Sequence, residues 1–127
     1  MKAVIQRVKQ SSVTIDNIVK AKIKSGLLIL IGIEDADEQN DIEYLSNKII
    51  NLRVFDDKDG VMNLSVKDID GDILVISQFT LHASTRKGNR PSYIRAAKPD
   101  FAVPMYEKFI QQLESNFGKA VKTGKFG

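Results

Sequence analysis

The sequence has no cysteine and no tryptophan, and it contains one histidine, His82. Without thiols, disulfide bonds, thiolate catalysis and thiolate metal sites are excluded. A single histidine leaves no His and carboxylate cluster with metal-ligand spacing, and no glycine-rich phosphate-binding loop is present. We therefore expect neither a metal ion nor a cofactor.

Long apolar runs are also absent. The longest, residues 27–33 with one glycine inside, is far too short to span a bilayer. The N-terminus alternates charged with apolar residues and lacks the continuous apolar core of a signal peptide. These features predict a cytoplasmic protein without a membrane segment.

At 127 residues the chain is long enough for one domain, residues 1–127, with its own hydrophobic core. The net charge is +3, and lysines and arginines gather in residues 1–25 and 82–98 while acids gather in residues 34–43. Such asymmetry is compatible with a polyanionic partner. An ordinary solvated surface of mixed charge is the alternative, and charge alone does not decide between them.

The first part of the chain reads as strands. Residues 3–9 alternate in polarity, and the next two apolar segments predict a hairpin around Asp16 and Asn17. Residues 27–33 are continuous leucine and isoleucine with one glycine, which is typical of a strand buried on both faces. We expect this segment to be the central strand of the sheet.

Two segments have helical spacing. Asp41 is a plausible N-cap for the first helix, and Pro99 and Asp100 open the second, which Gly118 ends. A strand is expected to begin at residues 120–123. The fold class predicted is α+β, with a mostly antiparallel sheet or barrel-like layers packed against two helices. The apolar positions of the helices are Ile42, Leu45, Ile49 and Leu52 in the first, and Phe101, Met105, Phe109, Leu113 and Phe117 in the second.

The acidic segment at residues 56–60 partly fits a calcium-binding loop. Phe55 and Val66 would then stand at its first and twelfth positions, where the loop needs oxygen ligands. We interpret the segment as a turn.

The segment GDILVISQFTLHAST, residues 71–85, begins as an apolar strand and becomes polar without a turn residue. Alternation along a strand would place Gln78, Thr80 and His82 in one row. This row is either the ordinary half-exposed end of an edge strand, or a binding site held at the tip of a rigid strand. The basic segment that follows favours a site for a phosphate-bearing substrate, because residues 82–98 contain five cations and no acid.

A protein nucleophile in this segment would be Ser77 or Thr80, and its only histidine base would be His82. Residues two apart on a strand are roughly 7 Å apart at the backbone, so His82 is poorly directed at Thr80. We favour His82 as a surface residue. The chemistry expected is therefore polarisation of a carbonyl by backbone amides, with attack by water or a substrate hydroxyl.

Five segments together resemble bacterial D-aminoacyl-tRNA deacylase over essentially the whole chain. They are AVIQRV at residues 3–8, NLRVFDD at 51–57, SQFTL at 77–81, TRKGNRPS at 85–92 and TGKFG at 123–127. The resemblance implies hydrolysis of the ester that links a D-amino acid, or mischarged glycine, to the terminal adenosine of tRNA. This reaction provides chiral proofreading in translation, and the family acts as a homodimer.

The resemblance also implies roles for individual residues. Backbone amides around Gln78 and Phe79 would bind the oxyanion, and water assisted by the 2′-hydroxyl of the tRNA would attack. The expected catalytic residues are Ser77, Gln78, Phe79 and Thr80, and the expected substrate-binding or tRNA-binding residues are Gln6, Arg7, Arg86, Lys87, Arg90 and Ser92.

One motif of the family has no counterpart in residues 1–127. In the family, a further strand carries an Asn-x-Gly-Pro-Val-Thr motif, whose Gly-Pro dipeptide reaches the partner subunit's site and excludes L-amino acids. Arg7 would fix that dipeptide across the interface. We expect the protein to continue past Gly127, because an end there would leave a strand edge without its partner.

Two other classes of function stay open on the residues alone. A noncatalytic RNA-binding module would use the same cations, although Tyr93 is the one aromatic residue of the basic segment available for stacking. A small serine or threonine hydrolase of free esters would need the general base that the segment lacks.

Overall fold

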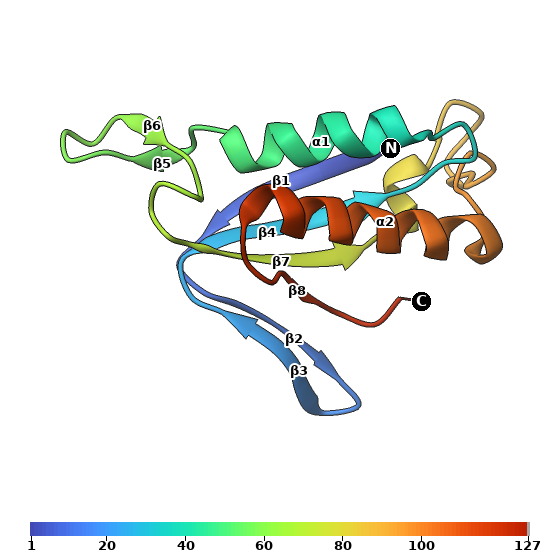
Figure 1. The fold of residues 1–127 in the computed structure, drawn as a ribbon. Coiled ribbons are helices and arrows are strands. Elements are labelled where there is room, and N and C mark those ends of the chain that lie inside the picture. Colours follow the sequence, from blue (N-terminus) through green and yellow to red (C-terminus); the bar gives the residue numbers. More distant parts are fainter. Residues whose placement is uncertain (127) are drawn as a thin grey trace.

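The computed structural model describes residues 1–126, and a four-stranded sheet forms its centre (Figure 1). The strand order is β1-β4-β7-β8. β1 (Lys2–Val8) runs antiparallel to β4 (Gly26–Gly32), which is parallel to β7 (Asp72–Ser77), and β8 (Lys122–Thr123) is parallel to β7. The predicted α+β class with two helices is confirmed, and the central sheet is mixed, because three of its four strands run in the same direction.

The helices α1 (Gln39–Asn51) and α2 (Pro99–Phe117) pack against the same face of this sheet (Figure 1). Their predicted apolar stripes supply the helix side of the core, since Ile42, Phe109 and Leu113 are fully buried against the strand residues Leu27 and Ile29. Leu52 is an exception, because it follows the last residue of α1 and is only half-buried. Gly118 ends α2 in the left-handed conformation with φ 84°, as predicted. Neither helix within residues 1–126 has the length and apolar content to cross a membrane.

The start of α1 differs from the prediction. Glu38 is the N-cap, and Asp41 occupies the third helical position. The carboxylate of Asp41 accepts a hydrogen bond from the Glu38 N–H at 2.8 Å. Asp41 therefore caps the helix from inside its first turn, because a carboxylate at this position reaches back to the backbone donor that precedes the helix.

Two hairpins extend from the sheet. β2 (Ser11–Ile15) and β3 (Ile18–Ile23) are joined by Asp16 and Asn17, which have φ values of 52° and 64° and confirm the predicted turn. β5 (Phe55–Asp56) and β6 (Met62–Leu64) flank the acidic segment, which is a turn as interpreted. Backbone hydrogen bonds from Val61 and Asp59 hold the pKa of Asp57 below its usual value.

The face of the sheet opposite the helices is partly open. Leu27, Ile29 and Ile31 of β4 are buried under the helices, but Leu28 and Leu30 are only half-buried. β4 is central as predicted, but burial on both of its faces was wrong. Val4, directly across from Leu30 on β1, is 49% exposed. This chain therefore leaves an apolar strip of its sheet exposed.

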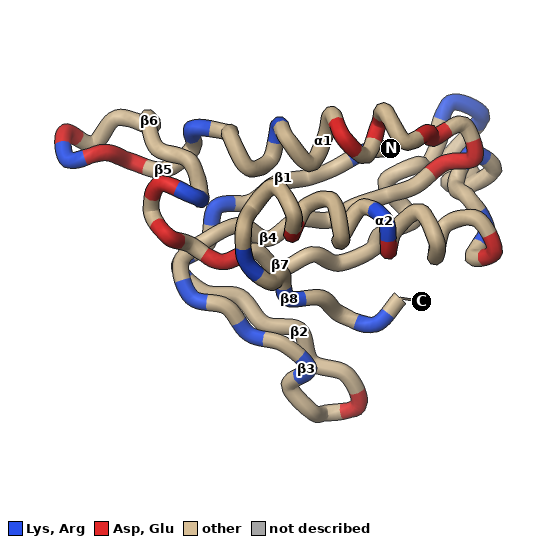
Figure 2. The backbone as a smooth tube through the Cα atoms, viewed as in Figure 1, with Lys and Arg blue, Asp and Glu red and all other residues tan. Residues whose placement is uncertain are grey.

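Charge is distributed unevenly over the fold. Figure 2 shows lysines without acids along the β2–β3 hairpin, apart from its tip, and acids along the connection into α1 and around the β5–β6 turn. The basic segment 82–98 lies at the end of the sheet where β4 and β7 finish (Figure 1). The cations predicted from the sequence are thus divided between two separate regions.

Candidate functional site

The site forms where β7 ends. β7 finishes at Ser77, and a single turn of 3₁₀ helix, η1 (Phe79–His82), follows at once. The predicted row of Gln78, Thr80 and His82 on one strand face is therefore wrong. The chain turns because the Gln78 carbonyl accepts the Leu81 N–H at 3.3 Å, which replaces strand pairing with a local bond.

The backbone donors at this turn are arranged differently from the prediction. The Gln78 N–H donates to the Ile31 carbonyl at 2.7 Å and so belongs to the β4–β7 ladder. The N–H groups of Phe79 and Thr80, the first two of η1, donate to no residue that the structure describes. Free donors are expected at the first positions of any helical turn. The pair able to bind an oxyanion is thus Phe79 and Thr80, one residue later than expected.

The side chains of the turn pair with one another. The Gln78 amide Nε2 donates a short hydrogen bond to the Thr80 hydroxyl, so these two predicted residues do come together. Ser77, Gln78 and Thr80 are half-buried, and the Phe79 ring is 58% exposed. The Thr80 hydroxyl is held by an amide donor and has no imidazole base beside it.

His82 is buried, with 3% of its surface exposed, so its assignment as a surface residue was wrong. Its Nδ1 lies 3.7 Å from Glu34 Oε2, and its Nε2 has no hydrogen-bond partner in the described part of the chain. The ring packs directly against β4 at Gly32. A side chain at position 32 would have little room, since its Cβ atom would lie 3.0 Å from the Cδ2 atom of His82. His82 therefore fastens η1 to the end of β4 instead of serving Thr80.

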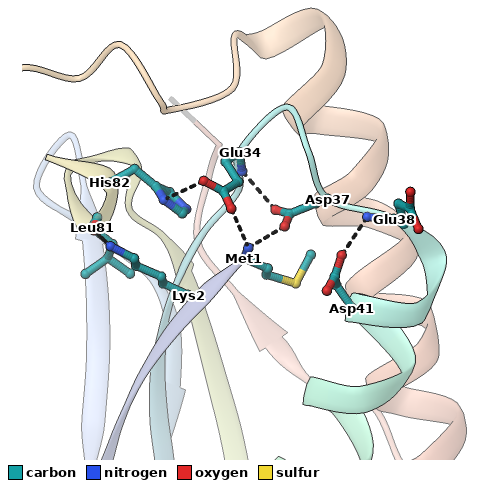
Figure 3. Close-up of polar contacts among 8 residues, drawn as sticks. All are labelled: Met1, Lys2, Glu34, Asp37, Glu38, Asp41, Leu81 and His82. Atoms are coloured by element: carbon teal, nitrogen blue, oxygen red, sulfur yellow. Dashed lines mark hydrogen bonds and ion pairs between the residues drawn. The ribbon is translucent and has the colours of Figure 1, made fainter.

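Figure 3 shows the polar contacts around this ring. The Lys2 ammonium donates to the Leu81 carbonyl at 3.3 Å, which ties β1 to η1. The Met1 ammonium pairs with Asp37 and lies 3.8 Å from Glu34 Oε1. β1, η1 and the connection from β4 to α1 are consequently held together at this end of the sheet.

A cavity of about 480 Å³ opens beside this turn, and Phe79 but not Thr80 is among the residues that line it. Ser77, Gln78 and Phe79 form one wall, and Tyr93, Pro99 and Phe126 are among the residues that line the rest. The Phe79 and Tyr93 rings meet edge to face, with centroids 5.2 Å apart. The cavity lies at the carboxyl ends of the parallel strands β4 and β7, where ligands commonly bind in open sheets.

Tyr106 supports the floor of this region from α2. Its hydroxyl donates to the Val75 carbonyl at 3.4 Å, and its ring packs against Phe126. Burial raises the pKa of Tyr106 to about 12. The phenol therefore stays protonated at neutral pH and does not act as a base.

The basic segment forms a second cavity of about 880 Å³. Ser84 and Ser92 close its loop with two backbone hydrogen bonds, Ser84 N–H to Ser92 O at 2.7 Å and the reverse at 2.8 Å. The cavity contains all four predicted residues of the loop together with His82, Glu34 and two further cations. The predicted residues are Arg86, Lys87, Arg90 and Ser92, and the further cations are Lys2 and Arg95.

Gln6 and Arg7 lie elsewhere in this chain. Arg7 is opposite Leu27 on β4, four residues from Ile31, which pairs with Ser77. This separation is about 13 Å along the strand. The Arg7 guanidinium donates to the Val54 carbonyl at 2.8 Å and pairs with Asp56 at 3.3 Å. The structure thus does not bring Gln6 and Arg7 to residues 77–80 within one chain.

The sequence reading missed Glu34 and several residues that line the first cavity, among them Phe126. Glu34 follows β4, so it reaches the end of β7 only because the two strands are parallel. The mostly antiparallel sheet that we expected gave no reason to place them together. Phe126 is adjacent to the cavity because the segment after β8 continues alongside β7, where Gly124 N–H donates to the Val75 carbonyl at 3.4 Å.

Comparison with known sequences identifies close relatives. The family model for D-Tyr-tRNA(Tyr) deacylase matches residues 4–127. The D-aminoacyl-tRNA deacylase of Flavobacterium psychrophilum is 66% identical over 127 residues, which is 100% of this chain and 85% of that protein. The D-aminoacyl-tRNA deacylase of Parabacteroides distasonis is 60% identical over the same shares of the two chains.

Two solved structures are similar in fold. The c-Myc DNA Unwinding Element Binding Protein superposes with a TM-score of 0.95 at 40% identity, over 100% of this chain and 86% of that one. A probable eukaryotic D-amino acid tRNA deacylase has a TM-score of 0.74 at 17% identity, over 91% and 68%. The second likeness concerns the fold alone.

The contact between His82 and Glu34 predicts a stability effect. His82→Ala should lower the free energy of unfolding by about 2–4 kcal/mol, because it empties a buried site between η1 and β4. Urea unfolding of the purified protein measures the change. Lys87→Ala, an exposed position in the same basic segment, is the control and should change the value by less than about 0.5 kcal/mol. Equal effects of the two substitutions would contradict the anchoring role of His82.

Proposed function

This chain belongs to the D-Tyr-tRNA(Tyr) deacylase family, and from that premise we propose that it hydrolyses the ester bond of D-aminoacyl-tRNA. Mischarged glycyl-tRNA is the second substrate. The products are free tRNA and the free amino acid, so the reaction removes wrongly charged tRNA from translation in the cytoplasm. The observation that carries this proposal is the pair of free amides at Phe79 and Thr80, in a turn whose residues Ser77, Gln78 and Phe79 line a cavity.

In this mechanism, the ester carbonyl oxygen of the substrate accepts hydrogen bonds from the Phe79 and Thr80 N–H groups. Attack on the carbonyl carbon moves negative charge to that oxygen, and fixed donors stabilise the charge more in the transition state than in the ground state. Removing one such donor typically costs about 10²–10³ in kcat. The Gln78–Ile31 bond and the buried His82 hold the two donors in place.

The attacking water is activated without a protein base. Gln78 engages the Thr80 hydroxyl, and His82 is buried against Glu34. Tyr106 keeps its proton, since burial raises its pKa to about 12. We assign the role of positioning and activating the water to the 2′-hydroxyl of the terminal adenosine, which lies next to the ester in the substrate itself. Ser77, at the end of β7, contributes to the wall of the cavity.

The two cavities divide the substrate between them. Phe79 and Tyr93 supply aromatic surface on which the terminal base stacks, as unpaired RNA bases do on proteins. The basic loop on the other side of η1 binds phosphates through Arg86, Lys87 and Arg90, and Ser92 fixes the base of that loop. Affinity for tRNA should then fall with added salt, since each phosphate contact releases counterions.

A homodimer completes this proposal. Val4, Gln6, Leu28 and Leu30 share the open face of the sheet, and Val4 and Leu30 are directly opposite each other. A second copy on this face would cover the apolar strip and bring Gln6 toward the partner's site. Arg7 lies on the opposite face of β1, where it bonds to Val54 and Asp56, so it would reach a partner only past the edge of the sheet.

The alternative function is a noncatalytic nucleic-acid-binding module. The name of the c-Myc DNA Unwinding Element Binding Protein, which is 40% identical, describes binding to DNA. The family match over residues 4–127 and the relatives named as deacylases favour the enzyme.

The central test is the release of amino acid from tRNA. Purified protein should hydrolyse D-Tyr-tRNA at least about 100-fold faster than spontaneous hydrolysis, because an oxyanion site of two donors contributes at least this much. Release of labelled tyrosine measures the rate, and L-Tyr-tRNA, which we expect to be spared, is the matched substrate. Tight binding of D-Tyr-tRNA without release of tyrosine would support the binding module instead.

The donors can be separated from the Thr80 side chain. Phe79→Pro removes the Phe79 N–H at the first helical position, where proline fits, and should lower kcat by about 10²–10³. Thr80→Ala should reduce kcat less, because it leaves both N–H groups. Phe79→Ala, which removes the ring but keeps the donor, is the control. Complete loss of activity in Thr80→Ala, together with an acyl-enzyme trapped on the wild-type protein, would restore covalent catalysis by Thr80.

The dimer is tested on the open face. Val4→Lys places a charge in the apolar strip and should convert the protein to monomer, because an unpaired charge is costly to bury. Light scattering after size exclusion measures the mass. Val61→Lys, an exposed apolar residue at the β5–β6 turn, should leave the mass unchanged. A wild-type monomer, or a dimer that survives Val4→Lys, would argue against this interface.

A further inference from the structure

The β2–β3 hairpin carries a row of lysines. Lys20 and Lys22 lie on β3 and Lys24 follows directly, so the three occupy alternate positions, and all are exposed. Alternate positions on a strand share one face and are roughly 6.6 Å apart at the backbone. Ser12 on β2 is paired with Lys22 and adds a hydroxyl to the same face. The β2–β3 pairing shifts between Val13 and Thr14, which leaves Lys20 as the extra residue of a β-bulge. The hairpin thus presents three exposed cations and a hydroxyl, although their spacing is not that of a regular strand.

The opposite face of the hairpin is used for packing. Ile23, which lies between Lys22 and Lys24 and so points to the other side of β3, is 2% exposed. Val13 on β2 lies against Gly124 in the segment after β8. A Cβ atom added at Gly124 would be 3.6 Å from the Cγ2 atom of Val13, which is ordinary contact distance. The lysine face therefore has a fixed direction in the fold and is not a free flap.

The excess of positive charge in this chain is concentrated in two regions. Residues 1–33 and 82–98 contain eleven of the 19 lysines and arginines but only Asp16 of the 16 acids. The rest of the chain holds eight cations and fifteen acids, so it is acidic overall. The lysine row is consequently part of a local excess of positive charge, and Figure 2 shows the β2–β3 hairpin without acids except at its tip.

These lysines have no partners of their own. The ion pairs found within residues 1–126 involve none of Lys20, Lys22 and Lys24. By contrast, Lys119 pairs with Asp70 and Asp72 on the neighbouring surface. Three like charges on one strand face repel one another, so a partner of opposite charge is stabilising there.

The row lies at the other end of the sheet from η1. The Ser25 carbonyl, next to Lys24, accepts the Asp72 N–H at the start of β7, whereas Gln78 follows its end. The two points are about 20 Å apart along the strand. An aminoacylated adenosine bound at η1 is too small to reach the lysine nearest the sheet, but the body of a tRNA is large enough.

We propose that the lysine face of the β2–β3 hairpin is a second RNA-binding surface, which binds the phosphate backbone of the tRNA outside its aminoacylated end. This inference rests on the proposed function and extends it from the ester to the body of the substrate. The surface binds without reading sequence, because lysines on a strand face contact phosphates as point charges. Its contribution is affinity for whole tRNA, and none of these lysines touches the reacting ester.

The test compares two triple substitutions with the same loss of charge. Lys20→Gln, Lys22→Gln and Lys24→Gln are combined in one variant, and Lys48→Gln, Lys58→Gln and Lys108→Gln, exposed lysines of α1, the β5–β6 turn and α2, are combined in the control. Binding of uncharged tRNA is measured by fluorescence anisotropy over a range of salt. Hydrolysis is measured on D-Tyr-tRNA and on D-tyrosyl-adenosine.

The hairpin variant should bind tRNA about tenfold more weakly at low salt, and its log-log salt slope should fall by about 2 to 3, since each phosphate contact contributes about 0.7–0.9. KM for D-Tyr-tRNA should rise in the same proportion, with kcat and the hydrolysis of D-tyrosyl-adenosine unchanged. The control variant should resemble the wild type in every measurement. Thermal unfolding checks that both variants are folded.

Two results would overturn the inference: unchanged tRNA binding in the hairpin variant, or equal weakening in both variants, which would indicate a general effect of net charge. Failure of the wild-type protein to hydrolyse D-Tyr-tRNA would contradict the proposed function alone. The binding comparison uses uncharged tRNA, so it decides on the hairpin surface whether or not hydrolysis occurs.

Discussion

The hydrogen bond from the Gln78 N–H to the Ile31 carbonyl is the last bond that holds β7 to β4, and the arrangement of the site depends on where it falls. The two strands are parallel, so both finish at the same edge of the sheet. One residue beyond this bond the chain turns into η1, and the next two amides lose their acceptors. If β4–β7 pairing continued for two more residues, the Phe79 and Thr80 N–H groups would be used for it. If the pairing ended earlier, η1 would not start from a residue that is fixed to the sheet.

The segments around this bond separate two cavities from each other. η1 and residues 92–97 separate the aromatic cavity from the basic one, with Phe79 and Tyr93 lining the first and His82 and Arg95 the second. His82 and Glu34 lie beneath the turn and fasten it to the end of β4. Ester chemistry, base stacking and phosphate binding can thus use neighbouring residues of one short stretch without competing for the same atoms.

Much of the fold could be predicted from local signals. The hairpin at Asp16 and Asn17 and the helix that Gly118 ends are set by residues close in sequence, so a single sequence contains enough information. Strand direction is not a local property. The mostly antiparallel sheet that we expected could not place Glu34 beside His82. The exposure expected for His82 came from its place next to a basic segment, which contains no information on this packing.

The site was predicted in part for the same reason. The SQFTL segment directed attention to residues 77–80, but alternation was extended past Ser77, where the chain has already left the sheet. The donors implied by the resemblance, around Gln78 and Phe79, lie one residue before the free pair in the structure. The open face of the sheet contains Val4 because β1 pairs with β4. Sequence periodicity indicates that positions in β1 alternate between two faces, but it does not identify the strand with which β1 pairs.

The two backbone bonds between Ser84 and Ser92 isolate the residues that lie between them. A loop clamped at its base can exchange its outer residues, or change its length, while its ends keep their positions next to η1. The outer residues of this loop could therefore change over evolutionary time, or be redesigned in the laboratory, without disturbing the geometry of η1.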